Sequence, residues 1–173
     1  LAISIVLLAY PYLKNKIFFS YAALILIASC IHFYALIMIP AYFLLTLKPS
    51  IKHYTVMGSI GLFVFAISTQ LLKLLASVSP KVETYSETFY LQQGSDFRII
   101  LFPIIYFGTL LAFKKILLKQ DKNGGIFLNL AFYSMLFNFM AIKHSILARF
   151  SHYFLIFMVL AFAEIAHGLR PAN

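Results

Sequence analysis

Long apolar segments alternate with short polar ones along the whole chain. The apolar segments cover residues 1–12, 17–47, 54–76, 99–113, 126–142 and 153–168. A helix needs about 20 mostly apolar residues to cross the hydrocarbon core of a bilayer, and most of these segments approach that length. The pattern therefore predicts an all-α protein built as a polytopic bundle of transmembrane helices.

The first apolar segment begins at once, without Met and without a preceding basic stretch. Because no small-residue cleavage site follows it, the segment is not typical of a signal peptide. We interpret residues 1–12 as the end of a spanning helix. On this interpretation residues 1–173 form a single partial membrane domain, the later part of a larger multi-pass protein.

The segment 17–47 has two interpretations. At about thirty residues it is long for one spanning helix and short for two. Pro40 lies inside it and lacks the backbone N–H that a helix interior needs, so we expect a kink there. The segment is therefore either one long, tilted and kinked helix or two half-helices that form a re-entrant hairpin.

Composition supports a membrane location. Hydrophobic residues make up 62% of the chain and charged residues 11%, and the mean hydropathy is +0.92. A soluble domain usually contains about 25% charged residues. So few charges cannot cover a soluble surface, and we conclude that the lipid bilayer surrounds this protein.

The charge balance is strongly basic, with 14 Lys and Arg, 5 Asp and Glu, and a formal net charge of +9. The basic residues cluster between the apolar segments, which is typical of loops that follow the positive-inside rule. No basic patch is combined with aromatic residues in a polar domain. We therefore exclude nucleic acid as a partner.

The lysines also predict an orientation. The loop 114–125 contains four of them and is expected to be cytoplasmic. Counting spans from this loop places the segments 77–98 and 143–152 on the outer face. The same rule favours the hairpin for 17–47, because Lys14 and Lys16 then lie inside as well.

His32 lies in the middle of an apolar segment, where an ionisable side chain is a functional candidate. It either acts on a substrate inside the membrane or is a neutral imidazole that bonds to a neighbouring carbonyl. Its surroundings in the sequence leave both interpretations open.

Arg149 lies at the predicted outer end of a span, and His152 and Tyr153 follow three and four residues later, on the same helical face. A guanidinium can bind phosphate oxygens with two N–H groups at once, so this face could hold an anion. An interfacial Arg beside an aromatic belt is the common alternative. These residues alone favour the alternative.

The predicted outer loop contains further polar candidates. Asp96 could cap the helix that follows it, and Arg98 could be a second anion ligand or an ordinary interfacial residue. Glu83 and Glu87 lie four residues apart in the same loop, which is more typical of a solvated segment than of a paired-acid site.

Metal-binding motifs are not repeated in the sequence. The Glu164-x-x-His167 spacing occurs once, whereas carboxylate di-metal sites need two copies and two further glutamates. The sequence also contains a single cysteine, Cys30, and no phosphate-binding glycine loop. We therefore expect neither a metal nor another cofactor.

Three stretches together resemble the EpsG family. They are "ASCIHFYALIMIPAYFLL" at 28–45, "YLQQGSDFR" at 90–98 and "ARFSHYFLIF" at 148–157. The first resembles a family pattern of Ala, His, Ala-Leu-Ile and Pro. The last resembles its Arg-x-x-x-Tyr-Phe element. The resemblance implies a Wzy-type polymerase of exopolysaccharide or O-antigen assembly in the bacterial cytoplasmic membrane.

The resemblance also implies roles for individual residues. His32 and Arg149 would be catalytic, while Arg98 and Tyr153 would bind substrate. His152 departs from the family pattern, which more often has a small or apolar residue there, and we place it with the substrate ligands. The implied substrate is a polyprenyl-diphosphate-linked oligosaccharide, and the implied partners include other polysaccharide assembly proteins.

Other functions remain open at this point. A transporter or flippase for lipid-linked sugars would use the same arginines but would need no base. A non-catalytic membrane subunit would keep His32 for structure only. A polytopic acyltransferase also uses an intramembrane His, but its accompanying motifs are missing from this sequence.

Overall fold

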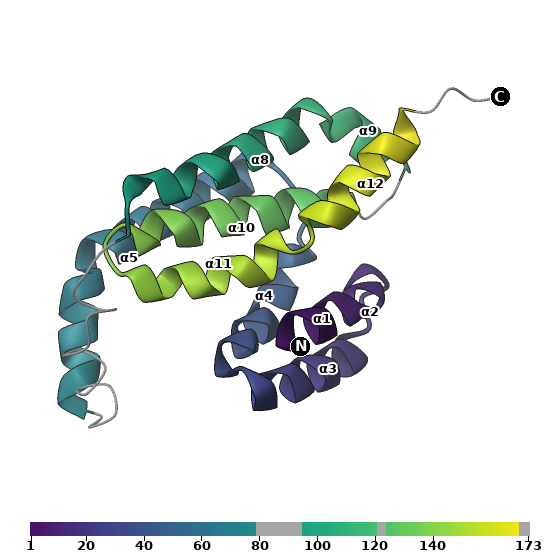
Figure 1. Cartoon of the computed structure of the whole chain (residues 1–173). Coiled ribbons are helices and arrows are strands. Elements are labelled where there is room, and N and C mark those ends of the chain that lie inside the picture. The colour runs from purple at the N-terminus through teal and green to yellow at the C-terminus, as the bar shows by residue number, and fades with distance from the viewer. Residues whose placement is uncertain (79–94, 121–123, 170–173) are drawn as a thin grey trace.

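The computed structural model describes residues 1–78, 95–120 and 124–169, and these residues form helices joined by short connections (Figure 1). The first half contains α1 (Ala2–Leu8), α2 (Tyr10–Lys14), α3 (Phe18–Ile31), the 3₁₀ helix η1 (Phe33–Ile37), α4 (Met38–Leu45) and α5 (Ile51–Val78). The second half contains η2 (Phe97–Ile100), α8 (Leu101–Ala112), α9 (Lys114–Gln120), α10 (Gly125–Ala141), η3 (Ser145–Leu147), α11 (Ala148–Leu155) and α12 (Met158–Gly168). No strand occurs among the described residues, which confirms the all-α class.

Helix α10 is the centre of the bundle. It lies between α8 and α11 (Figure 1), and most of its residues are buried on every side rather than along one stripe. The Phe137 ring of α10 stacks on Phe154 of α11 with their centroids 5.4 Å apart. On the other side, Phe132 of α10 contacts Phe107 of α8 at 5.7 Å. An apolar helix surrounded by helices thus organises the fold.

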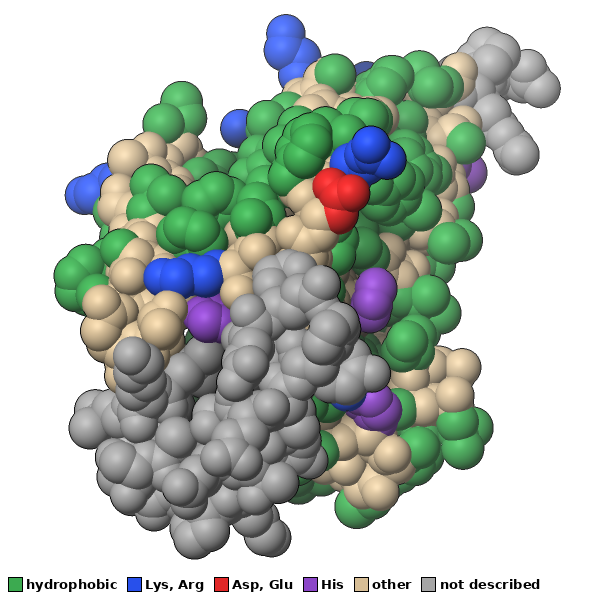
Figure 2. Space-filling view, turned by 60° about the vertical axis from the view of Figure 1, so that its left-hand side comes forward, with side chains coloured by type: hydrophobic (Ala, Val, Ile, Leu, Met, Phe, Trp, Pro, Cys, Tyr) green, Lys and Arg blue, Asp and Glu red, His purple; other side chains and the backbone are tan. Residues whose placement is uncertain are grey.

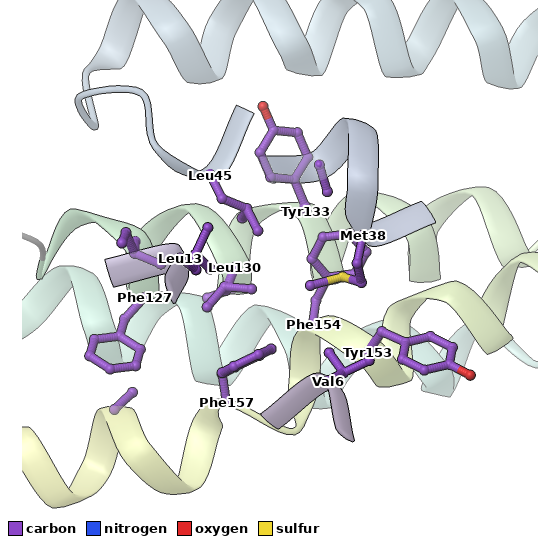
Figure 3. Packing of buried hydrophobic residues seen from close by; sticks show 14 of the residues in the cluster. Val6, Leu13, Met38, Leu45, Phe127, Leu130, Tyr133, Tyr153, Phe154 and Phe157 are labelled. Carbon is purple, nitrogen blue, oxygen red and sulfur yellow. The ribbon is translucent and has the colours of Figure 1, made fainter. Parts of the chain in front are cut away.

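The core continues from α10 into the first helices of the chain. Figure 3 shows Val6 of α1 and Met38 of α4 against Leu130, Phe154 and Phe157. All of these side chains except Val6 belong to α4, α10 or the segment around α11, so residues far apart in sequence share one core. This packing fixes the first helices, and with them the end of α3, against α11.

The segment 17–47 folds as two helices that turn back on each other. His32 has extended backbone angles, with φ −147° and ψ 103°, and it ends α3. The Tyr21 hydroxyl of α3 donates to the Met38 carbonyl of α4 at 3.0 Å, and the Phe18 and Phe43 rings lie 5.2 Å apart. The structure therefore has a helical hairpin in place of one long helix.

The interruption falls at His32, and the expected kink at Pro40 is wrong. Pro40 is the third residue of α4. The first N–H groups of a helix have no intrahelical acceptor, so a proline in the first turn removes no hydrogen bond. Whether the hairpin is re-entrant in a bilayer stays a prediction.

Apolar side chains dominate the exterior as well as the core. Figure 2 shows one face on which, over the described residues, hydrophobic side chains cover most of the surface and charged ones occur mostly singly. Two stretches among the described residues, Ile51–Gln70 and Ala148–Gly168, are long and apolar enough to cross a membrane. A surface of this kind is suited to lipid.

Asn129 joins three helices inside this apolar bundle. It lies on α10 and is fully buried. Its Nδ2 donates to the carbonyls of Leu45 and Leu47 at 2.9 and 2.8 Å, and its Oδ1 accepts from the Tyr54 hydroxyl at 2.9 Å. The last carbonyls of a helix lack intrahelical partners. Asn129 therefore caps the end of α4 and ties it to the start of α5.

We expect Asn129→Ala to lower the free energy of unfolding by about 1–3 kcal/mol, because it leaves buried polar groups without partners. Thermal unfolding of the purified protein in detergent measures the change. Asn138→Ala is the matched control, since Asn138 is also buried on α10 but its Nδ2 donates only to Ser134 of the same helix at 2.9 Å. Equal losses in the two variants would contradict the capping role.

Candidate functional site

The break at His32 brings its imidazole to α11. The side chain is exposed at the end of α3, and its Nδ1 lies 2.7 Å from the Tyr153 hydroxyl oxygen. These two residues are 121 positions apart in the chain. The Tyr153 ring is buried at the edge of the core, and Figure 3 shows its hydroxyl directed away from Phe154 and the core side chains. The hydrogen bond to Tyr153 of α11 therefore holds the His32 imidazole in place.

Helix α11 places Arg149 and His152 beside this pair. Arg149 lies in the first turn of α11, and residues three and four positions later point to the same side. The resulting pocket of about 370 Å³ is lined by Leu1, Ala2, Ile3, Ile31, His32, Arg149, His152 and Tyr153. Four of the five predicted site residues therefore line one pocket.

Tyr34 connects the imidazole with the guanidinium, and the sequence did not single it out. The Arg149 guanidinium carbon lies 5.6 Å from the centroid of the Tyr34 ring, within cation–π distance. The Tyr34 and His32 rings are 5.2 Å apart, and Phe150 meets Tyr34 edge-on at 5.3 Å. The sequence offers one sign that Tyr34 belongs to the site, namely its position two residues after His32. The 3₁₀ helix η1 is needed to turn the Tyr34 ring toward α11.

Arg98 does not line this pocket. Its side chain is 80% exposed, and its Nε lies 3.7 Å from the Asp96 carboxylate. The expected cap is confirmed, because Asp96 Oδ1 accepts from the Arg98 N–H at 3.0 Å at the start of η2. The Ser95 N–H donates to the Ala141 carbonyl at 2.9 Å, so this segment lies at the C-terminal end of α10.

The remaining acidic candidates of the outer loop are not described. Glu83 and Glu87 lie outside the described residues. Within the described part of the chain, no three His, Cys, Asp or Glu side chains lie together as the ligands of one metal would.

The chemistry of the pocket follows from its two kinds of wall. Arg149 supplies a permanent cation, and His32 and His152 supply two imidazoles, while no described residue that lines the pocket is acidic. Leu1, Ile3 and Ile31 supply the apolar wall. A guanidinium in such a place stabilises negative charge on oxygen, and an imidazole next to it can accept a proton. The pocket is therefore suited to an anionic group attached to an apolar chain.

Comparison with known proteins gives one result that covers the chain. Neither the curated proteins nor the solved structures compared with the chain include a match. The model of the EpsG family matches residues 1–171. This family implies a membrane location and a polysaccharide-related role, and the apolar helices agree with the membrane location. The chain belongs to the EpsG family.

Proposed function

We propose that this protein is a polysaccharide polymerase of the bacterial cytoplasmic membrane. It joins lipid-diphosphate-linked oligosaccharide repeat units on the outer face, as a multi-pass protein that works with other polysaccharide assembly proteins. The observation that carries the proposal is the convergence of His32, Arg149, His152 and Tyr153 on one pocket with an apolar wall. A diphosphate attached to a polyprenyl chain needs both parts of that pocket.

Arg149 binds the diphosphate of the donor in this proposal. The reaction breaks the bond between the anomeric carbon of the donor and a diphosphate oxygen, so negative charge grows on that oxygen. A preorganised cation at this point stabilises the transition state more than the ground state. The Tyr34 ring lies 5.6 Å from the guanidinium carbon and orients it.

His32 is the base that activates the acceptor. The acceptor hydroxyl oxygen forms the new glycosidic bond, and its proton passes to the imidazole. The Tyr153 hydroxyl oxygen lies 2.7 Å from Nδ1 and holds the ring in position. In the proposed step Nδ1–H donates to this oxygen, so that the unprotonated Nε2 takes the proton. His152 binds further oxygens of the substrate in the pocket, and Arg98, which does not line the pocket, binds oxygens of the substrate outside it. No nucleotide or metal is required for these steps.

The lipid tail of the substrate leaves the pocket along apolar surface. Ile31 and Phe33 flank His32, and both are exposed, Phe33 to 73%. Exposed apolar side chains next to a polar pocket suit a substrate with a charged head and a polyprenyl tail. The tail then stays in the bilayer while the head reaches Arg149.

Incubation of the purified protein in detergent with lipid-linked repeat units extracted from its host tests the proposal. We expect chains longer than one repeat and release of polyprenyl diphosphate in equal number to the bonds formed. Substrate that stays at one repeat, in the presence of folded protein, would contradict the polymerase. Movement of the substrate across vesicle membranes without bond formation would identify a flippase instead.

We further expect Tyr34→Leu to lower the rate of polymer formation about fivefold, because a cation–π contact is worth about 1 kcal/mol. Phe63→Leu is the matched control, since it removes an exposed ring of α5 that does not line the pocket of His32. Gel separation of the polymer formed in a fixed time gives both rates. Equal loss in the two variants would show that Tyr34 does not act through Arg149.

A further inference from the structure

A second polar pocket lies at the other end of the first helical hairpin. It has a volume of about 470 Å³, and three lysines from three separate segments line it. Lys16 lies two residues before α3, whereas His32 directly follows it, and 14 residues of helix span about 21 Å. We call this site the three-lysine pocket, defined by Lys16, Lys48 and Lys114. It is distinct from the His32 pocket.

The three-lysine pocket concentrates charge of one sign. Lys16 and Lys48 are exposed and Lys114 is half-buried, and no described residue that lines the pocket is acidic. Like charges that share a pocket repel each other, and an anion between them removes this repulsion. The positive-inside rule explains why each lysine lies between the apolar segments, but it does not require three such places to bring their lysines together.

The backbone at Lys16 gives an independent observation. Lys16 has φ 58°, and no other described residue, glycine included, has a positive φ. The Ile17 N–H donates to the Tyr12 carbonyl at 2.8 Å and the Lys16 N–H to Leu13 at 3.2 Å, which is the hydrogen-bond pattern of a Schellman motif. Glycine is favoured at this position because it adopts the left-handed conformation without strain. A lysine here keeps its charge at the expense of backbone strain, as residues at binding sites often do.

The other walls of the three-lysine pocket include Pro49 and the first turn of α10. Gly125 begins α10 at this pocket, and a Cβ on it would lie 2.5 Å from Cδ of Pro49. This close approach brings the first turn of α10 up to the loop that carries Lys48. The N-terminal N–H groups of that helix, for which the described residues show no side-chain cap, add to the positive potential of the lysines.

We propose that the three-lysine pocket binds a phosphate group. Lysine ammonium groups bind phosphate as mobile point charges, and three of them more than neutralise one phosphate monoester, which carries about −2 at pH 7. The pocket lies at the end of the bundle that the lysine-rich loop predicts to be cytoplasmic. Phosphate there comes from the headgroup of an anionic phospholipid or from a soluble phosphate compound. This proposal does not rest on the polymerase function.

Thermal unfolding of the full chain in nanodiscs tests the proposal and distinguishes the two sources. One sample contains phosphatidylcholine only, a second contains added phosphatidylglycerol, and a third contains phosphatidylcholine with inorganic phosphate at matched ionic strength. We expect stabilisation in the second sample if the ligand is a lipid headgroup and in the third if it is soluble. No stabilisation in either sample would overturn the proposal.

Lys16→Gly separates charge from backbone strain. We expect this variant to unfold at a higher temperature than the wild type in phosphatidylcholine, because the strain is relieved, yet to bind the stabilising phosphate at least about tenfold more weakly. Lys114→Ala is a second variant in which we expect weaker phosphate binding, and it leaves the Schellman motif at Lys16 unchanged. Lys115→Ala is the matched control, since this neighbour is exposed and does not line the pocket. Equal weakening in the control would show non-specific attraction and overturn the proposal.

Discussion

Arg149→Ala is expected to lower polymer formation by about 10²–10³-fold while the protein stays folded in the membrane. A decrease of this size is typical when an enzyme loses one preorganised group that stabilises charge in the transition state. Arg149 lies on α11 in the same pocket as His32, and it contacts the Tyr34 ring at 5.6 Å, so its removal opens space without taking away a core side chain. The loss should therefore appear in activity far more than in stability.

Surface polysaccharide separated on a gel gives the chain length, and membrane abundance of the protein is measured in the same cells. Single repeat units should accumulate on lipid outside the membrane. Arg149→Lys should retain part of the activity, because it keeps the charge but loses the two-pronged contact to phosphate. Lys119→Ala, which removes an exposed cation outside both polar pockets, should leave the polymer unchanged. Unchanged long polymer in Arg149→Ala would make Arg149 an interfacial anchor.

His32→Ala is expected to lower polymer formation by about 10²–10⁴-fold, the usual contribution of a positioned general base. The imidazole is exposed toward the pocket, and Tyr153 orients it through a 2.7 Å hydrogen bond. Tyr153→Phe removes the hydroxyl but keeps the buried ring, so we expect a smaller loss than in His32→Ala. The rate with purified protein and lipid-linked repeat units measures both.

His53 provides the control for a histidine that serves structure only. Its Nε2 lies 3.0 Å from the Tyr133 hydroxyl oxygen, so it also pairs with a tyrosine, but it does not line the His32 pocket. His53→Ala should lower thermal stability and leave the rate per folded molecule close to that of the wild type. If His32→Ala behaves in the same way, its imidazole is a structural group and the proposed base is wrong.

Together the two substitutions separate the polymerase from a transporter of the same substrate. A flippase needs Arg149 to bind the diphosphate but has no acceptor hydroxyl to activate. In a flippase, Arg149→Ala would stop the appearance of repeat units outside the cell, whereas His32→Ala would not. In the polymerase, both variants leave repeat units on lipid outside the membrane.

The sequence predicted most residues of the candidate site, but it could not predict that they lie together. His32, Arg149, His152 and Tyr153 were each identified from local signals, such as an ionisable residue in an apolar segment and the spacing of one helical face. Their meeting depends on the packing of α3 and η1 against α11. Arg98 had an equally good local signal, and the fold leaves it outside the pocket beside Asp96.

Tyr34 and Asn129 show which roles local patterns miss. Tyr34 is one aromatic residue among many, and only the 3₁₀ geometry of η1 brings it between His32 and Arg149. Asn129 is a polar residue within an apolar helix, and its role depends on carbonyls more than eighty positions earlier in the chain. Neither contact leaves a periodic trace in the sequence.

The sequence by itself determined the helical class, the membrane environment and the EpsG family, because hydrophobic runs, charge content and short motifs are local properties of the chain. Tertiary structure alone decided that the hairpin turns at His32 and that Pro40 fits the first turn of α4 without a kink. It also decided which polar residues share a pocket. Such outcomes depend on the packing of distant helices, because a side chain's partners are set by the three-dimensional contacts that the lowest free energy selects and not by its neighbours in the chain.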